Sequence, residues 1–192
     1  QENLTVNEVN ITGNTADFGG GILTNDFADT TVNYSTISGN SGSGILNYSA
    51  TTTVNYSTIN DNSSDSSGGG IATISFYGGS VTVNNSTISG NSAANSGGGI
   101  DGFDSTVNIN NSTITNNSAG ENGSGVALDF ASGIITSSII TGNKGSDDFS
   151  GSAISGGNNL IGSNSDAEFT DIVFIDGVKE DIVGTIDNPL PN

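Results

Sequence analysis

The chain has 192 residues, of which 20 are acidic and two are basic, so its formal net charge is −18. A chain this acidic repels phosphate backbones and anionic lipid surfaces, so we expect neither nucleic-acid binding nor adhesion to an anionic membrane. No apolar run is long enough to span a bilayer, so membrane insertion is not expected either. It contains no cysteine, which excludes disulfides and thiolate chemistry. The 29 glycines, with many Ser, Thr, Asn, Val and Ile residues, favour short strands and tight turns over helices.

A block with the pattern V-x4-I-x2-N recurs six times from the N-terminus onward, with Ile in place of Val in the last two copies. The successive isoleucine markers are 26, 22, 29, 26 and 26 residues apart, and the block itself never changes length. The six blocks begin at Val6, Val32, Val54, Val83, Ile109 and Ile135. A fixed period of this size indicates a repeat architecture.

A glycine-rich run ending in an aliphatic residue follows each of the first five blocks. The run lies 8, 5, 9, 9 and 9 residues after the asparagine of its block, so the length variation falls in the connecting arcs. The aliphatic residues that end the runs are Ile22, Ile45, Ile71, Ile100 and Val126. Rigid blocks joined by arcs of variable length are typical of stacked coils with loops at fixed corners.

The spacing predicts an all-β fold, a right-handed parallel β-helix of about six coils with 22–29 residues each. Two apolar residues five positions apart do not share a face of one straight strand, so the chain bends between them. Each coil then holds three short strands, the third beginning after the glycine run. We expect one domain over residues 1–192, with regular coils in 1–143 and the last coil and an irregular C-terminal cap in 144–192.

The asparagine that ends each block is predicted to form a ladder along one corner of the helix. A side-chain amide donates and accepts hydrogen bonds, so stacked asparagines can satisfy one another and the backbone of the turn. The six ladder positions are Asn14, Asn40, Asn62, Asn91, Asn117 and Asn143.

An aromatic residue follows the glycine run once per coil, and two interpretations of this pattern stay open. The rings either pack together on a loop face or form an exposed platform for sugar rings. The five residues are Phe27, Tyr48, Phe76, Phe103 and Phe130. Tyr34 and Tyr56 share another coil position and are expected to stack on adjacent rungs.

Threonines flank the central isoleucine of the block and provide a third functional alternative. Thr36, Thr58, Thr87 and Thr113 fall in register, and Ser38, Asn60, Ser89 and Thr115 follow two residues later. Two outward columns of this kind resemble the ice-binding face of some β-solenoids, although strand surfaces are commonly rich in threonine.

The alternation of "GGGI" with "ISGN" or "ITNN" resembles the right-handed β-helix repeats of bacterial surface proteins, the polymorphic outer-membrane-protein type and its relatives in large cyanobacterial exoproteins. The tail from Gly156 onward is similar to the segment that follows such repeats in those proteins. The resemblance implies an extracellular location, on a cell surface or secreted, and a chain that belongs to something longer.

Catalysis is not expected, because the residue types that β-helix enzymes use are missing. Polyuronate lyases and epimerases need a base and a cation, usually Arg, Lys, His or Ca²⁺. Arginine and histidine are absent, and Lys144 and Lys179 lie outside the regular repeats. Glycoside hydrolysis needs two carboxylates, and adjacent Asp147 and Asp148 show no suitable placement on a strand. Asp101, Asp104 and Asp129 follow the glycine runs of successive coils and could converge, which leaves a glycosidase as an open alternative.

Calcium is the one cofactor that the sequence favours. Carboxylates clustered at turns, together with backbone carbonyls, are the oxygen ligands that Ca²⁺ takes. The candidate clusters are Asp26 with Asp29, and Asp101 with Asp104 and Asp129. A solvated acidic loop is the alternative for each.

Together these patterns predict a non-catalytic structural or adhesive section of an extracellular protein. Self-association or adjoining domains are the expected partners, with end-to-end assembly into filaments as one form, because the open ends of a β-helix are unpaired strand edges. A carbohydrate surface is a further expected partner. The alternatives are a polysaccharide-binding or polysaccharide-active protein and an ice-binding solenoid.

Overall fold

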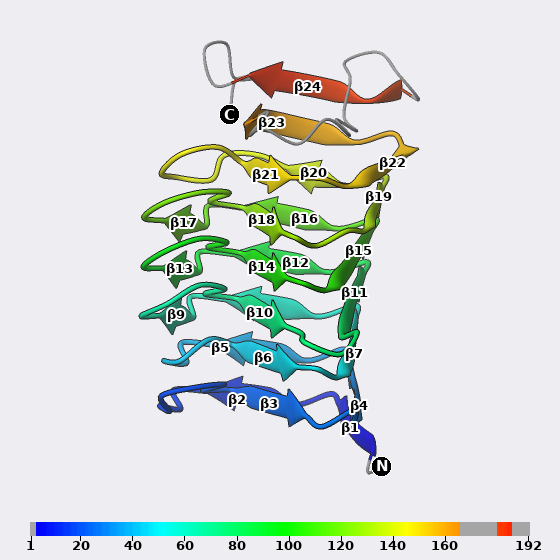
Figure 1. The fold of residues 1–192 in the computed structure, drawn as a ribbon. Coiled ribbons are helices and arrows are strands. Elements are labelled where there is room, and N and C mark those ends of the chain that lie inside the picture. The colour runs from blue at the N-terminus through cyan, green and yellow to red at the C-terminus, as the bar shows by residue number, and fades with distance from the viewer. Residues whose placement is uncertain (1–2, 166–179, 186–192) are drawn as a thin grey trace.

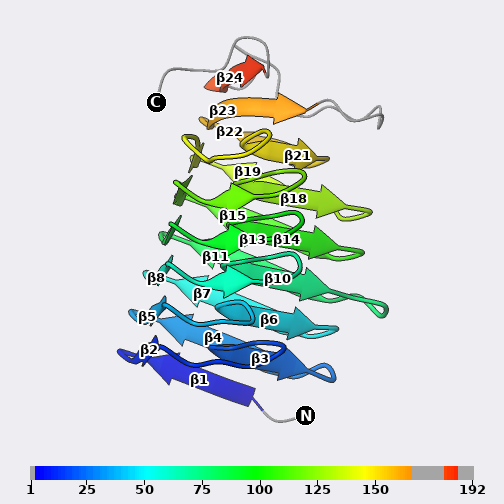
Figure 2. The same cartoon turned by 90° about the vertical axis from the view of Figure 1, so that its left-hand side faces the viewer.

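The computed structural model describes residues 3–165 and 180–185, which form a right-handed parallel β-solenoid of about six turns. Figures 1 and 2 show the coils stacked in chain order, from β1 at one end to β24 at the other. Every strand pair runs parallel, each strand pairing with its counterpart one coil away. The predicted all-β fold class is confirmed.

Three walls surround the interior, and most coils give one strand to each. Wall A consists of β1 (Asn3–Asn7), β4 (Asp29–Asn33), β7 (Thr51–Asn55), β11 (Ser80–Asn84), β15 (Thr106–Asn110), β19 (Ile134–Thr136) and β22 (Ile154–Gly157). Wall B consists of β2 (Asn10–Thr12), β5 (Thr36–Ser38), β8 (Thr58–Asn60), β12 (Thr87–Ser89), β16 (Thr113–Thr115) and β20 (Ile139–Ile140). Wall C consists of β3 (Ile22–Asn25), β6 (Ile45–Tyr48), β10 (Ile71–Ile74), β14 (Ile100–Phe103), β18 (Val126–Asp129) and β21 (Phe149–Gly151).

Walls B and C merge at the C-terminal end of the described residues. The longer strand β23 (Leu160–Ser165) pairs with β20 through its first residues and with β21 through its last. The next strand, β24 (Ile182–Thr185), adds a further parallel rung on β23. The predicted cap falls largely on residues 166–179, which lie outside the described residues.

The interior is built by the repeated aliphatic residues, each of which stacks on its own copies one coil away. The register pairs Val32 with Val54 in wall A, Ile37 with Ile59 in wall B, and Ile45 with Ile71 in wall C. All six of these side chains are fully buried. Removing an isoleucine side chain from water stabilises the fold by about 2 kcal/mol, so the repeat alone supplies a continuous core.

The bend between walls A and B is a single residue in the left-handed conformation. Its φ is close to +49° at Tyr34, Tyr56, Asn85, Asn111 and Ser137. One left-handed residue reverses the alternation of the side chains. Apolar residues five positions apart therefore both face inward, as the spacing predicted.

Each of the three middle coils also contains a very short fourth strand, which the sequence did not predict. These strands are β9 (Ser63–Ser64), β13 (Ser92–Ala93) and β17 (Ser118–Ala119), and they form a three-stranded sheet. They follow the ladder asparagines, in residues with little strand propensity. Their pairing is imposed by the stacking of the arcs rather than by local preference.

Candidate functional site

The six predicted asparagines lie in one column, buried in its middle and exposed at Asn14. Each of the first five donates from both its backbone N–H and its Nδ2 to Oδ1 of the next, at 2.9–3.0 Å. From Asn40 onward, Nδ2 also donates to the carbonyl of the wall B isoleucine in the preceding coil, at 2.9–3.2 Å. The column thus satisfies backbone groups at a buried corner, a structural role.

A second column, of serines, runs along the corner between walls A and B. The backbone N–H of each serine donates to Oγ of the next serine at 3.1–3.2 Å, and each Oγ donates to a carbonyl two residues earlier. The serines are Ser35, Ser57, Ser86, Ser112 and Ser138. This column was not predicted, although a serine recurs two residues before the central isoleucine in five of the six blocks.

Both columns end on a carboxylate. Oδ1 of Asp148 accepts the backbone N–H and Nδ2 of Asn143 at 2.8 Å. In the second column Ser138 donates to Asn159, whose backbone N–H and Nδ2 both donate to Oδ1 of Asp181. The candidate catalytic neighbour Asp148 is therefore engaged in a structural terminus.

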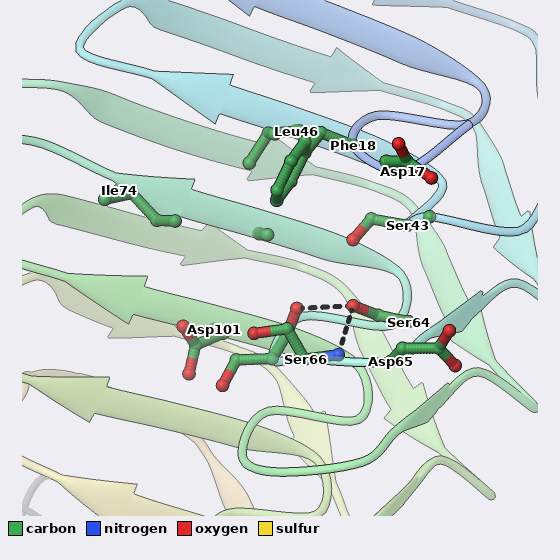
Figure 3. Close-up of a pocket in the computed structure, with 12 residues that line it drawn as sticks. Asp17, Phe18, Ser43, Leu46, Ser64, Asp65, Ser66, Ile74 and Asp101 are labelled. Atoms are coloured by element: carbon green, nitrogen blue, oxygen red, sulfur yellow. Dashed lines mark hydrogen bonds between the residues drawn. The ribbon is translucent and has the colours of Figure 1, made fainter.

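A pocket of about 240 Å³ opens on the outer face of wall C, where the repeat is shortest. The second coil has four fewer residues between its asparagine and wall C than the third and fourth coils, so its arc leaves a gap. Asp17 and Phe18 of the first arc line one side of the gap, and Ser64–Ser67 of the third arc line the other. Figure 3 shows these two groups facing each other, with Ser43 of the short arc between them.

Asp101 lines the same pocket and is the one charged member of a row of small and apolar residues. The strand register aligns it with Ala72 on one side and Ala127 on the other, and with Leu46 beyond Ala72. The glycine run of its own coil crosses over it, since a methyl group on Gly97 would meet the Cα of Asp101 at 2.6 Å. Asp101 is consequently only 6% exposed.

The carboxylate of Asp101 has no hydrogen-bond partner among the described residues, and the residue forms part of the pocket lining. Desolvation by this burial, with a smaller contribution from the negative charge of Asp129, raises the pKa of Asp101 to about 7. A carboxyl group in this condition is poised to bind a proton or a cation.

An apolar surface continues from the pocket along wall C. An adjoining hollow of about 290 Å³ is lined by Phe18, Leu23, Asn25, Leu46, Tyr48 and Ile74. Phe18 borders both hollows, and 71% of its surface is exposed. Residue types of this kind, beside a few polar groups, are typical of ligand sites.

The aromatic residues predicted to follow the glycine runs are exposed on the same side of the solenoid. Tyr48 contacts Phe76 with ring centroids 6.0 Å apart, and Phe103 contacts Phe130 at 5.9 Å. Phe27 lies 6.3 Å from Tyr77, an aromatic residue that the pattern did not include. These three pairs combine ring-on-ring packing with exposed ring area, so both interpretations of the pattern remain compatible with the geometry. We call these six residues the aromatic strip.

The predicted calcium clusters are only partly brought together. Asp101 and Asp129 are close enough for their charges to interact, whereas Asp104 and Asp26 are exposed turn residues with positive φ and Asp29 is half-buried. Among the described residues, no group of three or more acidic side chains is arranged to hold a metal ion. Calcium binding stays a prediction, and its test is the melting temperature with and without a chelator.

The two outward columns of wall B are in register, as their spacing required. The strand pairing aligns Thr36, Thr58, Thr87 and Thr113, and it aligns Ser38, Asn60, Ser89 and Thr115 beside them. The second column mixes three residue types, so the surface is not a uniform threonine array. Tyr34 and Tyr56, at the neighbouring corner, stack with ring centroids 5.1 Å apart and an interplanar angle of 7°.

No protein-family model matches the chain, and no curated protein is significantly similar to it in sequence. Within the part of the chain that the structure describes, no helix is long and apolar enough to cross a membrane.

Proposed function

We propose that the chain is a non-catalytic structural or adhesive section of a bacterial surface or secreted protein, of the repeat type that its sequence resembles. The observation that carries the proposal is the pair of hydrogen-bonded columns running through successive coils. They tie each coil to the next along buried corners and so favour a stiff rod. The high negative charge and the lack of cysteine suit a protein outside the cell.

End-to-end contact is the expected mode of assembly. Strands β1, β2 and β3 form the first described rung, and Leu4 of β1 belongs to the inward-facing row but is 46% exposed. A coil from another domain or another copy of the chain would cover this residue by adding parallel strands.

The test compares two lysine substitutions on the same strand. Leu4→Lys places a charge over the open end of the core, whereas Thr5→Lys places it on the outer face. Sedimentation over a concentration series should show association of the unsubstituted chain, weakened by Leu4→Lys and unchanged by Thr5→Lys. A monomer at every concentration would contradict self-association and leave an adjoining domain as the partner.

Absence of catalysis has its own assay. The chain should release no product from pectin, alginate or comparable polymers. Product formation that disappears in Asp101→Asn would contradict the non-catalytic proposal and favour a polysaccharide-active protein.

Carbohydrate binding is a second candidate function, favoured by the aromatic strip. Exposed ring faces offer apolar area of the kind on which sugar rings stack, and Phe76 and Phe130 each have more than half of their surface exposed. Affinity electrophoresis in neutral polysaccharides should show retardation that Phe76→Ala and Phe130→Ala reduce. Tyr56→Ala is the control and should have no effect, because it removes an exposed ring at a different corner, the one between walls A and B.

A further inference from the structure

We propose that the pocket on wall C, lined by Asp17, Phe18, Ser43, Ser64–Ser67 and Asp101, binds an amino sugar through its ammonium group, with Asp101 as the counter-ion. The inference deepens the carbohydrate-binding candidate by naming a ligand class and a second site apart from the aromatic strip. It does not depend on the rod function.

The pocket has the size of a single sugar ring and occurs once along the rod. It exists because one arc is four residues shorter than the two arcs that follow it, so the hollow is not repeated along the rod. Its volume of about 240 Å³ suits a ligand of the size of a single sugar ring rather than a polymer segment. The adjoining hollow past Phe18 provides room for a neighbouring sugar unit.

The carboxylate of Asp101 is buried without a partner among the described residues. Burying an ionised carboxylate without a partner costs several kcal/mol, so such groups are paired in stable proteins or become neutral. Asp101 is 94% buried, accepts no hydrogen bond from the described residues and faces the pocket. The raised pKa of Asp101, caused first by this burial, reflects the missing partner. A ligand cation would supply it.

The charge around the pocket is negative. Asp17 and Asp65 stand at its rim, and no basic residue belongs to its lining. With a net charge of −18 on the whole chain, the local field attracts cations and repels uronic acids and other anions. A neutral sugar gains nothing from this field, whereas a protonated amine does.

The remainder of the lining suits a ring that carries hydroxyl groups. Phe18 presents an exposed aromatic face, on which the C–H face of a sugar or its ammonium group can rest. Ser43 and Ser66 add hydroxyl groups to the lining. A linear alkylammonium would use the carboxylates but neither the ring face nor the serines.

The experiment is a calorimetric titration of the folded chain with two oligosaccharides of equal length, fully deacetylated and fully N-acetylated glucosamine tetramers. The deacetylated tetramer should bind at least ten times more tightly. Asp101→Asn should remove this preference and bring both affinities to the same level. Asp104→Asn is the control and should preserve the preference. It neutralises an exposed aspartate three residues further along the same coil, in a left-handed conformation that asparagine tolerates.

Each other outcome has a definite meaning. Equal affinity for the two tetramers, or a preference that survives in Asp101→Asn, overturns the proposal. Binding of spermidine as tight as that of the deacetylated tetramer overturns the assignment to a sugar. Circular dichroism and thermal melting verify that each variant is folded.

Discussion

Two columns of asparagine run along the solenoid, and they differ in what depends on them. The inner column, described above, binds backbone N–H and carbonyl groups at a buried corner. The outer column, at the end of the wall A strands, consists of Asn33, Asn55, Asn84 and Asn110, whose Nδ2 groups donate to the preceding Oδ1 at 2.9–3.0 Å. The outer asparagines are half-buried.

Two columns of hydrogen-bonded asparagine side chains can therefore contribute very different amounts to the free energy of unfolding. A hydrogen bond adds about 1 kcal/mol net, but a buried backbone group left without a partner costs about 1–3 kcal/mol. Water can replace an outer amide, whereas it cannot reach the inner corner. The number of dependent backbone groups, and not the number of amide contacts, should therefore set the effect of a substitution.

The largest expected effect is that of Asn91→Ala in the inner column. It removes the acceptor of the Asn62 N–H and the donor to the Ile59 carbonyl, both at a buried corner. We expect a loss of about 5 kcal/mol in the free energy of unfolding, measured by urea denaturation. Asn84→Ala in the outer column should cost less than about 1 kcal/mol. Equal losses at the two positions would contradict the comparison.

The second effect concerns Asp101, a buried polar group that belongs to neither column. Its pKa is about 7 in the folded protein and 3.8 for the free group, so between these values only the folded state holds the proton. Stability is then full below pH 4 and falls by about 1.4 kcal/mol per unit as pH rises toward 7. The total is about 4 kcal/mol.

The measurement for Asp101 is the free energy of unfolding at pH 5 and pH 8. Asp101→Asn keeps the shape of the side chain without the charge, and it should remove most of this slope and stabilise the protein at pH 8. A slope that persists in the variant would place its origin in other carboxylates.

The third effect is at the end of the inner column. Asp148→Ala removes the acceptor of two Asn143 donors and should cost about 3 kcal/mol. Asp148→Asn keeps an Oδ1 acceptor, so the cost should stay below about 1 kcal/mol. Similar losses for the two variants in urea denaturation would show that the carboxylate charge, rather than the acceptor, ends the column.

A smaller effect, of opposite sign, is expected where a buried hydroxyl has no column to join. The Thr52 hydroxyl has no hydrogen-bond partner, and the next coil has Val81 at the same position. Thr52→Val should stabilise the fold by about 1 kcal/mol, seen as a higher midpoint in urea. Thr53→Val, on the outer face of the same strand, should change stability by less than about half of this.

The smallest effect is predicted at the corner that carries the stacked tyrosines. Tyr56 has φ of 49°, as does Asn85 at the same position of the next coil. Tyr56→Asn loses the stack with Tyr34 but gains a residue that tolerates this conformation. The two terms are each about 1 kcal/mol or less, so the melting temperature should barely change. A large decrease would mean that the ring stack dominates.

The walls and the inner column were predictable because repetition makes each residue its own neighbour. Once the period places Val54 and Val83 on successive rungs, their contact and burial follow. The same logic places Asn62 on Asn91 without any knowledge of the loops. The serine column obeys this rule too, although it was not predicted.

The pocket was not predictable in the same way, because it depends on residues that occur once. The short second arc is visible in the sequence, but Phe18 and Asp65, which line the gap beside it, have no copies that would reveal their position. From the sequence, Asp101 was a candidate calcium ligand or catalytic carboxylate, and not a buried group. Its burial could not be read from the sequence, because an outward strand position is normally solvated. The glycine run that contains Gly97 covers Asp101 only in the folded protein.

A carboxylate ends both the inner asparagine column and the serine column, so the hydrogen bonds along each column all point toward the C-terminal end. From Asn40 to Asn117, each amide of the inner column accepts a hydrogen bond from the coil before it and donates one to the coil after it. The Asp148 carboxylate accepts but has no N–H to pass on, and Asp181 ends the serine column in the same way. The two carboxylates thus end the columns at the C-terminal end of the solenoid. Duplicated coils can be inserted anywhere upstream of them, so the length of the rod can change in evolution while its terminus stays the same.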